Sequence, residues 1–375
     1  MTGTPRSQTL HTDSNEAVTG FIRIIAAIAV TGAAVTFSAA AAAYETDQFY
    51  NRSQPIADST EVLNRKVNET LAEIVADWRK DHDQQALVDD IFHTLGGHHW
   101  VDKIERWAEH SPEVDKLETT RYDSIYGGLP IWSVRTTFLF GIGSTIRVND
   151  QLIGTDKLGH FFSQGRKFYR RYLKYGSEEK SARQSVFTER AIFGSGTTGA
   201  FSNADLVANY EGYRFYRSLF EDDMVTGKPA IVRWENGSWI IQREFDWADH
   251  VNEYWDEALN MNDFDVLLYG HMRKRLVSLC PQYWENPALY TLENEEELKS
   301  RYAHLGMRDS WFLRLDTLCL AEAPQQSDSL VAAGNEPESG LIVPSGQSNA
   351  TEDQTEDERL KNTHQSSGVF SGPRP

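Results

Sequence analysis

The chain has 375 residues, of which 40% are hydrophobic and ten are tryptophan, so it is long and apolar enough to form a substantial core. Its formal net charge is −18. A surface that binds nucleic acid needs basic residues to neutralise phosphates, so this charge argues against a nucleic-acid partner.

The segment Phe21–Ala43 is apolar and alanine-rich, with Arg23 at its front edge. Small residues at Ala41 and Ala43 form an A-x-A cleavage pattern before a polar run, which is the layout of a secretory signal peptide. An uncleaved membrane anchor is the alternative, because about 20 apolar residues can span a bilayer. Both interpretations predict an exported protein, either periplasmic or anchored to the inner membrane and facing the periplasm.

Residues 44–322 are predicted to form one helical domain. Asp58 and Glu61 resemble a capping box, which starts a helix by satisfying its first backbone N–H groups. In several segments apolar residues recur every three to four positions, as on one face of a helix. The expected helices are Val62–Trp78, Gln85–Leu95, His99–His110, Thr155–Lys174, Glu178–Phe193, Ala204–Phe220, Ala248–Leu259, Phe264–Cys280 and Trp311–Leu320.

Strand signals are fewer. Ile131–Phe140 and Thr145–Ile153 each show partial alternation and β-branched residues. Asn236 and Gly237 supply the positive φ values of a type I′ turn, so Ala230–Phe245 is expected to be a hairpin. The predicted fold class is therefore mainly α, with one or two small β-hairpins. It lies between the export segment 1–43 and an acidic tail, 323–375, whose composition is typical of disorder.

The chain contains two cysteines, Cys280 and Cys319. In an exported protein they could form a disulfide that closes a loop of about 40 residues. Two buried thiols in separate helices are the alternative, and the sequence leaves both open. The spacing matches neither a CxxC motif nor a zinc-ligand set.

The stretch TDKLGHFF, which begins at Thr155, carries an acid, a base and an imidazole among apolar residues. On a helix Leu158 and the two phenylalanines face one side, whereas Asp156 and His160 face the other. An ordinary amphipathic helix with a solvated polar face would give the same pattern.

The next two helices favour a buried cluster instead. Glu189 shares its helical face with apolar neighbours, and so do Asp205 and Asn209 on the following helix, whose solvated side is expected to carry Glu211. An unpaired buried carboxylate costs several kcal/mol, so these groups need partners, a metal or a proton. Ser202 is expected to cap the second helix.

We therefore expect a polar cluster between packed helices, with Gly212 allowing a second backbone to approach closely. Its members are Asp156, Lys157, His160, Glu189, Asp205 and Asn209. The cluster could be a purely structural network of ion pairs and hydrogen bonds. It could equally be a functional pocket, because carboxylates and an imidazole held together have shifted proton affinities.

The order D-K-x-x-H-F, then a glutamate, then D-x-x-x-N-x-x-G resembles the signature of the VanZ-like family and of small exported bacterial lipoproteins of the YfiM type. The matching residues are Asp156, Lys157, His160, Phe161, Glu189, Asp205, Asn209 and Gly212. The resemblance implies a role in the bacterial cell envelope. Two features depart from it: the charged stretch GRKFYRRYLK does not suit a multi-pass membrane protein, and no lipoprotein cysteine follows the export segment.

Two functional hypotheses follow. In an envelope enzyme, for instance a hydrolase acting on lipid or cell-wall material, a divalent metal would be held by Asp156, His160, Glu189 and Asp205. Alternatively His160, Glu189 and Asp205 would act as acid–base groups, with Asp156, Lys157 and Asn209 binding the ligand. In the second hypothesis the protein is not an enzyme, the cluster holds the helices together, and loops such as Tyr122–Trp132 contact an envelope component or a protein partner.

Overall fold

The computed structural model describes residues 45–78, 82–97, 101–129, 141–188, 199–308 and 310–322. All of these fall within one compact unit that spans residues 1–324. Four predictions lie outside the described residues: the export segment 1–43, the disordered tail 323–375, the strand at Ile131–Phe140 and the part of Glu189 in the site. None of the helices in the described part is long and apolar enough to cross a membrane.

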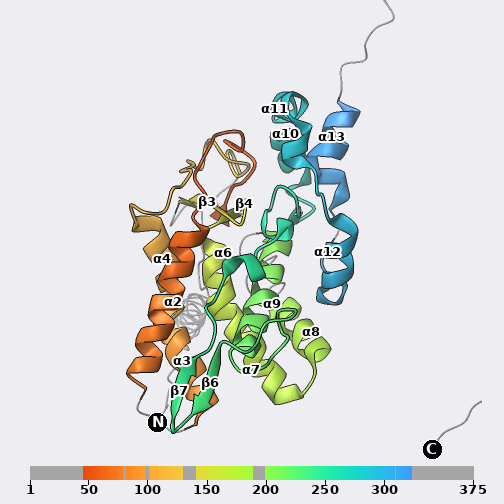
Figure 1. Cartoon of the computed structure of the whole chain (residues 1–375). Helices are drawn as coiled ribbons and strands as arrows, with labels where there is room; N and C mark the ends of the chain where they lie inside the picture. The colour runs from red at the N-terminus through yellow and green to blue at the C-terminus, as the bar shows by residue number, and fades with distance from the viewer. Residues whose placement is uncertain are drawn as a thin grey trace, which may run out of the picture. The chain divides into compact units, whose positions relative to one another are not determined.

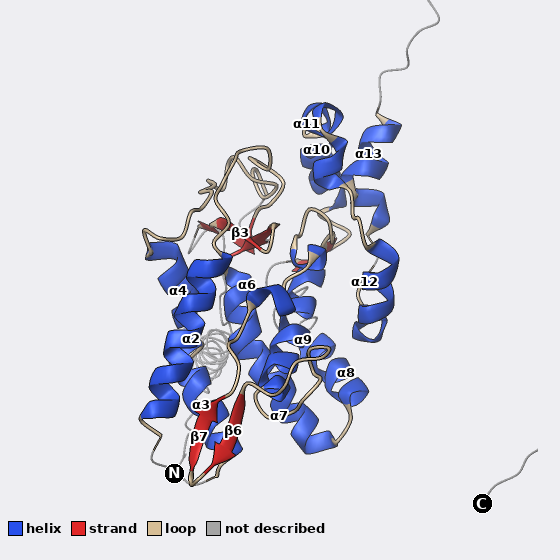
Figure 2. Cartoon of the chain, viewed as in Figure 1, coloured by secondary structure: helices blue, strands red, loops and turns tan. Residues whose placement is uncertain are grey.

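Helices dominate the described residues, as predicted (Figures 1 and 2). The α-helices are α2 (Thr60–Ala76), α3 (Gln84–Leu95), α4 (Lys103–His110), α6 (Asp156–Gly159), α7 (Gly165–Tyr175), α8 (Glu178–Thr188), α9 (Asn203–Ser218), α10 (Tyr269–Val277), α11 (Cys280–Glu285), α12 (Glu295–Tyr302) and α13 (Leu315–Ala321). One π-helical turn, η1 (His160–Gln164), joins α6 to α7 without a break.

The β-structure consists of two-stranded sheets. The strands are β1 (Glu45–Thr46), β2 (Ile142–Gly143), β3 (Thr145–Val148), β4 (Gln151–Gly154), β5 (Ala200–Phe201), β6 (Val232–Glu235), β7 (Ser238–Ile241) and β8 (Asp263–Phe264). β1 pairs with β2 in parallel, whereas β3–β4, β5–β8 and β6–β7 are antiparallel. The fold is therefore mainly α with small two-stranded sheets, as the sequence indicates.

The two hairpins both use type I′-like turns. Asn236 and Gly237 have φ values of 51° and 85°, so the hairpin predicted there is confirmed. The single strand predicted at Thr145–Ile153 is wrong, because the chain turns back within it. Asn149 and Asp150 have φ values of 49° and 61°, and they connect β3 to β4. Asparagine and aspartate tolerate this backbone region better than other non-glycine residues.

Several helical boundaries differ from the prediction. The capping box at Asp58 is wrong: Ser59 is the N-cap of α2, and the Asp58 carboxylate accepts backbone N–H groups of Thr60 and Asp150 instead. The helix predicted for Phe264–Cys280 is divided into β8, α10 and α11, and α12 was not predicted. The last predicted helix, Trp311–Leu320, is a 3-10 turn, η7 (Trp311–Leu313), followed by α13.

The predicted helix Ala248–Leu259 is wrong for a physical reason. The segment forms two 3-10 turns, η3 (Trp247–Asp249) and η4 (Glu253–Trp255). The side chains of Asp246 and Asn252 accept the first N–H groups of these turns, and Asp256 accepts the N–H of Ala258. Side chains that bond the backbone in this way compete with a continuous helix.

The hydrophobic core has two clusters. One gathers apolar side chains of α2, α3, α4, η1, α7 and α9, and the other gathers those of α10, α11 and α13. In the second cluster a disulfide joins Cys280 of α11 to Cys319 of α13, which decides between the two alternatives left open by the sequence. α6 lies between α4 and α9 and contacts both (Figure 1).

The segment α6–η1–α7 crosses α9 at very short range, as expected for Gly212. A Cβ at Gly212 would lie 2.0 Å from the carbonyl oxygen of Phe161, and one at Gly165 would lie 2.6 Å from the backbone of Gly212. Only residues without a side chain fit here. The crossing brings the polar residues of α6 and η1 against the N-terminal half of α9.

Candidate metal centre

Both faces of the α6–η1 segment are buried, so the alternative of a solvated polar face is wrong. Phe161 and Phe162 pack among aromatic rings that include Trp247. On the opposite face, the side chains of Lys157 and His160 are 1% and 7% exposed. A segment buried on both faces must satisfy its charged groups internally.

The ammonium group of Lys157 lies among three carboxylates. Its Nζ is 2.6 Å from Asp156 Oδ2, 2.7 Å from Asp205 Oδ1 and 2.8 Å from Glu257 Oε1. Lys157 donates hydrogen bonds to Asp156 and Glu257, whereas its contact with Asp205 Oδ1 is an ion pair without hydrogen-bond geometry. Lys157 therefore holds α6, α9 and the segment after η4 together.

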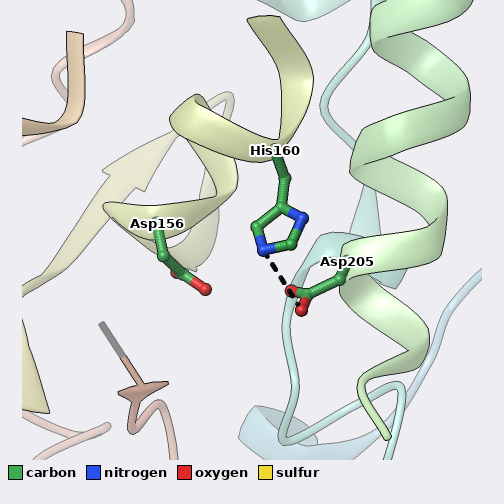
Figure 3. A group of neighbouring side chains, drawn as sticks. All are labelled: Asp156, His160 and Asp205. Carbon is green, nitrogen blue, oxygen red and sulfur yellow. Dashed lines mark ion pairs between the residues drawn. The ribbon is translucent and has the colours of Figure 1, made fainter. Parts of the chain in front are cut away.

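His160 has a defined partner at each ring nitrogen. Nδ1 is 3.0 Å from Asn209 Oδ1, and Nε2 is 3.3 Å from Asp205 Oδ2. Figure 3 shows the imidazole turned toward Asp205, with Asp156 on the adjacent turn of the same segment. Because an amide oxygen accepts hydrogen bonds, Nδ1 carries a proton. A protonated Nε2 pairs with the Asp205 carboxylate, whereas a deprotonated Nε2 offers its lone pair to a metal ion.

Asp205 stands at the N-terminal turn of α9. Ser202 is the N-cap, as predicted, and its hydroxyl accepts the N–H of Asp205 while donating to Glu257 Oε1. The unpaired N–H groups of a helix start favour a carboxylate there. The Asp205 side chain is 18% exposed, more than the other charged groups that contact Lys157.

The four acids of this cluster have different proton affinities. Burial alone would raise the pKa of Asp205, but the charges of His160 and Lys157 outweigh it and lower that pKa. Burial raises the pKa of Asp156 and of Glu257 despite the nearby ammonium. Burial, reinforced by these neighbouring acids, raises the pKa of Glu45 to about 8, so Glu45 is protonated at neutral pH.

The pKa of Lys157 is raised well above its usual value. Burial acts in the opposite direction, but Asp156, Asp205 and Glu257 outweigh it. A nucleophilic or basic lysine must lose its proton, and this environment keeps the proton on. The ammonium therefore serves as a fixed positive charge.

The structure brings together five of the six residues that the sequence predicted for the site. Asp156, Lys157 and His160 come from α6 and η1, and Asp205 and Asn209 come from α9. The sixth, Glu189, lies outside the described residues, so its part in the site stays a prediction.

Sequence reasoning missed two members of the cluster, Glu45 of β1 and Glu257. Glu257 lies in the segment for which a helix was wrongly predicted; it is buried and also accepts a hydrogen bond from Asn262. A local signal did exist: the segment EYWDEALNMND mixes acids with aromatic residues and contains no lysine or arginine to pair with them.

Three side chains of the cluster form a group of potential metal ligands. Asp156, His160 and Asp205 each offer one donor atom, and these atoms lie within 4.8 Å of one another. Donors at 2.0–2.2 Å from a tetrahedral ion are about 3.3–3.5 Å apart, and the separation of His160 Nε2 from Asp205 Oδ2 is 3.3 Å. The pair therefore already has the spacing of adjacent ligands.

A second buried charged cluster lies further along α9. Glu211 was predicted to face solvent, but its side chain is fully buried. Its carboxylate accepts hydrogen bonds from Arg214 at 3.1 Å, Arg301 at 2.8 Å, His250 at 3.2 Å and Tyr302 at 2.7 Å. The prediction failed because other elements surround α9, so no side of this helix is fully exposed to solvent.

No family model, no curated protein and no solved structure matches this chain. The resemblance to the VanZ-like family and to YfiM-type lipoproteins therefore stays a prediction. The functional argument rests on the geometry of the cluster itself.

Proposed function

We propose that this chain is a divalent-metal protein of the bacterial cell envelope in which Asp156, His160 and Asp205 hold the ion. The observation that carries the proposal is the orientation of His160. Its Nδ1 is fixed by Asn209 while Nε2 faces Asp205 at 3.3 Å. Metal-ligating histidines are typically oriented in this way by a hydrogen bond at the other ring nitrogen.

Charge balance supports a further cation. With Asp156, Asp205 and Glu257 ionised, three negative charges face the single positive charge of Lys157. Protonated Glu45 adds none, and His160 adds none once its Nε2 has lost its proton to bind an ion. A divalent ion would neutralise this excess. Burial raises the pKa of Asp156 and of Glu257, and the neighbouring acids add to this effect. A bound divalent ion would favour the ionised form of both groups.

The ligand set suits a transition metal with open positions. Imidazole with carboxylates is a donor set that zinc, manganese and iron accept. Three protein ligands leave at least one position for water or substrate, as in catalytic zinc sites. Such an ion lowers the pKa of bound water or polarises an ester or phosphoryl oxygen, which fits a hydrolase acting on lipid or cell-wall material. Glu189 would be a fourth ligand or an acid–base residue.

Location in the envelope is supported by two independent features. The N-terminal segment has the composition of a signal peptide or anchor. The Cys280–Cys319 disulfide is of the kind that persists in oxidising compartments.

The alternative is a cluster that only holds the helices together, in a protein that contacts an envelope partner. The observation that favours it is that Lys157 already bridges three carboxylates. Under this alternative the protein binds no divalent ion, and its cluster residues affect the free energy of unfolding alone.

Metal analysis separates the two functions. The full chain is purified without chelator, dialysed against zinc or manganese, and its metal content is measured by mass spectrometry. We expect about one ion per chain, reduced at least tenfold by His160→Ala and by Asp205→Asn, because removing a ligand of a three-ligand site weakens binding strongly.

His304→Ala is the matched control. His304 also lies beside a carboxylate, with Nε2 3.7 Å from Glu178 Oε1, but it belongs to no cluster of potential ligands among the described residues. It should retain the ion. Metal-free wild-type protein, or equal metal loss in the control, would contradict the proposal and leave the structural alternative.

A further inference from the structure

Helix α7 is strongly basic in a chain whose net charge is −18. Its sequence, GRKFYRRYLKY, contains five basic residues. Two of them point toward other elements: Arg166 pairs with Asp89, and Arg171 donates to Ser185 Oγ at 2.8 Å. Arg170 and Lys174 are exposed, and neither has an acidic partner among the described residues.

These exposed charges surround an open hollow of about 510 Å³ at the C-terminal end of α7. Its lining residues are Gln85, Arg170, Arg171, Leu173, Lys174 and Tyr175. None of them is acidic. We call this surface the α7 surface.

The α7 surface also exposes apolar side chains. Leu173 is 44% exposed and Tyr175 is 40% exposed. The ammonium of Lys174 lies 5.3 Å from the centre of the Tyr175 ring, so a cation and an aromatic ring are presented together. Gly176, with a φ of 60°, ends the helix beside them. Basic residues flanked by leucine and tyrosine are typical of helices that lie on a membrane interface.

We propose that the α7 surface docks on the anionic headgroups of a phospholipid bilayer. An acidic protein is repelled by such a bilayer over most of its surface, so attraction requires a local concentration of positive charge. Arg170, Arg171 and Lys174 provide that charge. Leu173 and Tyr175 then enter the boundary between headgroups and acyl chains, where an aromatic hydroxyl and an aliphatic side chain are both accommodated.

This docking is independent of the proposed metal ion, because the α7 surface shares no residue with the ligand group. Docking would attach the protein to the lipid surface whether or not the N-terminal segment is cleaved. A small phosphorylated molecule is the other anionic occupant of such a hollow, and the experiment distinguishes the two.

The test is co-sedimentation of the full chain with vesicles. One set contains 30% phosphatidylglycerol in phosphatidylcholine, and the other contains phosphatidylcholine alone. Each lysine or arginine near an anionic surface is worth about 1 kcal/mol, so Arg170→Gln with Lys174→Gln, which removes two positive charges, should lower the partition coefficient on the anionic vesicles about 30-fold. The charge-reversed pair Arg170→Glu with Lys174→Glu should show a larger loss in the same direction.

The matched control is Arg273→Glu with Lys274→Glu on α10, which makes the same change of charge at another exposed basic pair. It should bind anionic vesicles within about threefold of wild type, and every variant should keep the wild-type melting temperature and metal content.

Equal losses in the two charge-reversed proteins would contradict the proposal, because vesicle binding would then depend on the net charge of the protein and not on the α7 surface. A partition coefficient unchanged by the α7 substitutions, or wild-type binding abolished by millimolar inorganic phosphate but not by sodium chloride of equal ionic strength, would overturn the docking proposal. The last result would indicate a small phosphorylated ligand.

Discussion

Helix α9 carries two buried charged clusters that differ in how completely their acids are satisfied. Glu211, in the second half of the helix, is fully buried and accepts hydrogen bonds from four side chains, two of them arginines. Asp205, near the start of the helix, belongs to a group of four acids that shares one lysine and one histidine. The first cluster has a surplus of positive charge, and the second has a surplus of carboxylates.

This difference separates a structural network from a candidate site. A buried network whose every member is hydrogen-bonded rigidifies the core and leaves no group free for chemistry. The donors around Glu211 outweigh the effect of its burial and lower its pKa to about 2. In the Lys157 cluster, burial raises the pKa of three of the four acids. An additional cation would therefore stabilise the second cluster and not the first.

The largest expected effect comes from removing the ammonium. Lys157→Met leaves three buried carboxylates without their shared cation, and breaking a buried ion pair in this way costs about 4 kcal/mol. We expect urea denaturation in the presence of chelator to show a loss of this order in the free energy of unfolding. Because the substitution increases the acid surplus, added zinc or manganese should restore more than half of the loss.

The control for this rescue is the other cluster. Divalent ions should not restore any stability to Glu211→Gln, which leaves an excess of positive charge. If the Lys157→Met protein gains nothing from a divalent ion, the geometry of Asp156, His160 and Asp205 does not bind metal and the proposed function is wrong.

Glu211→Gln itself is expected to cost about 3 kcal/mol, because Arg214, Arg301 and His250 lose the carboxylate that compensates their burial. Denaturant titration at pH 7 measures this directly. Glu221→Gln is the comparison: Glu221 also accepts an arginine, Arg217, but its side chain is 43% exposed. An exposed pair contributes less than about 1 kcal/mol. Similar losses in the two variants would mean that the burial of Glu211 has no energetic consequence.

The two clusters also show what the sequence could predict. Helical periodicity predicted that Asp205 and Asn209 turn inward, because they share a helical face with apolar residues. Asp156 and His160, on a helix close in the chain, were then expected to be their partners. Ser202 as N-cap and the Asn236–Gly237 hairpin depend on local chemistry, and both were predicted correctly. A pattern that spans one or two helical turns can be recognised in the sequence without knowledge of the fold.

Glu257, Glu45 and Glu211 could not be predicted because their partners are remote. Lys157 and Glu257 are separated by 100 positions, and Glu211 and Arg301 by 90. A prediction from helical periodicity assigns an acid to the side of the helix with fewer apolar residues, and it assumes that this side is exposed to solvent. For α9 the assumption failed, since His250, between η3 and η4, and Arg301 and Tyr302 of α12 bring polar groups to Glu211.

The two clusters are also expected to differ in how their stability depends on pH. For Glu45 the pKa rises from 4.5 to about 8 on folding, so between these values the folded chain holds a proton that the unfolded chain has lost. Its contribution to stability is full below pH 4.5 and is lost as the pH rises through 8. For Glu211 the pKa falls from 4.5 to about 2, so its contribution is present above pH 4.5 and is lost as the pH falls through 2.

Glu45→Gln tests this contrast, because glutamine resembles the protonated acid. We expect the variant and the wild type to unfold with similar free energies at pH 5, and the variant to be more stable by about 4 kcal/mol at pH 9, where wild-type Glu45 must ionise among other acids. Urea denaturation at the two pH values measures the difference. Glu73→Gln, at an exposed position of α2, should leave the pH profile unchanged. Parallel profiles for wild type and Glu45→Gln would show that Glu45 is not held protonated by its burial beside Asp156, Asp205 and Glu257.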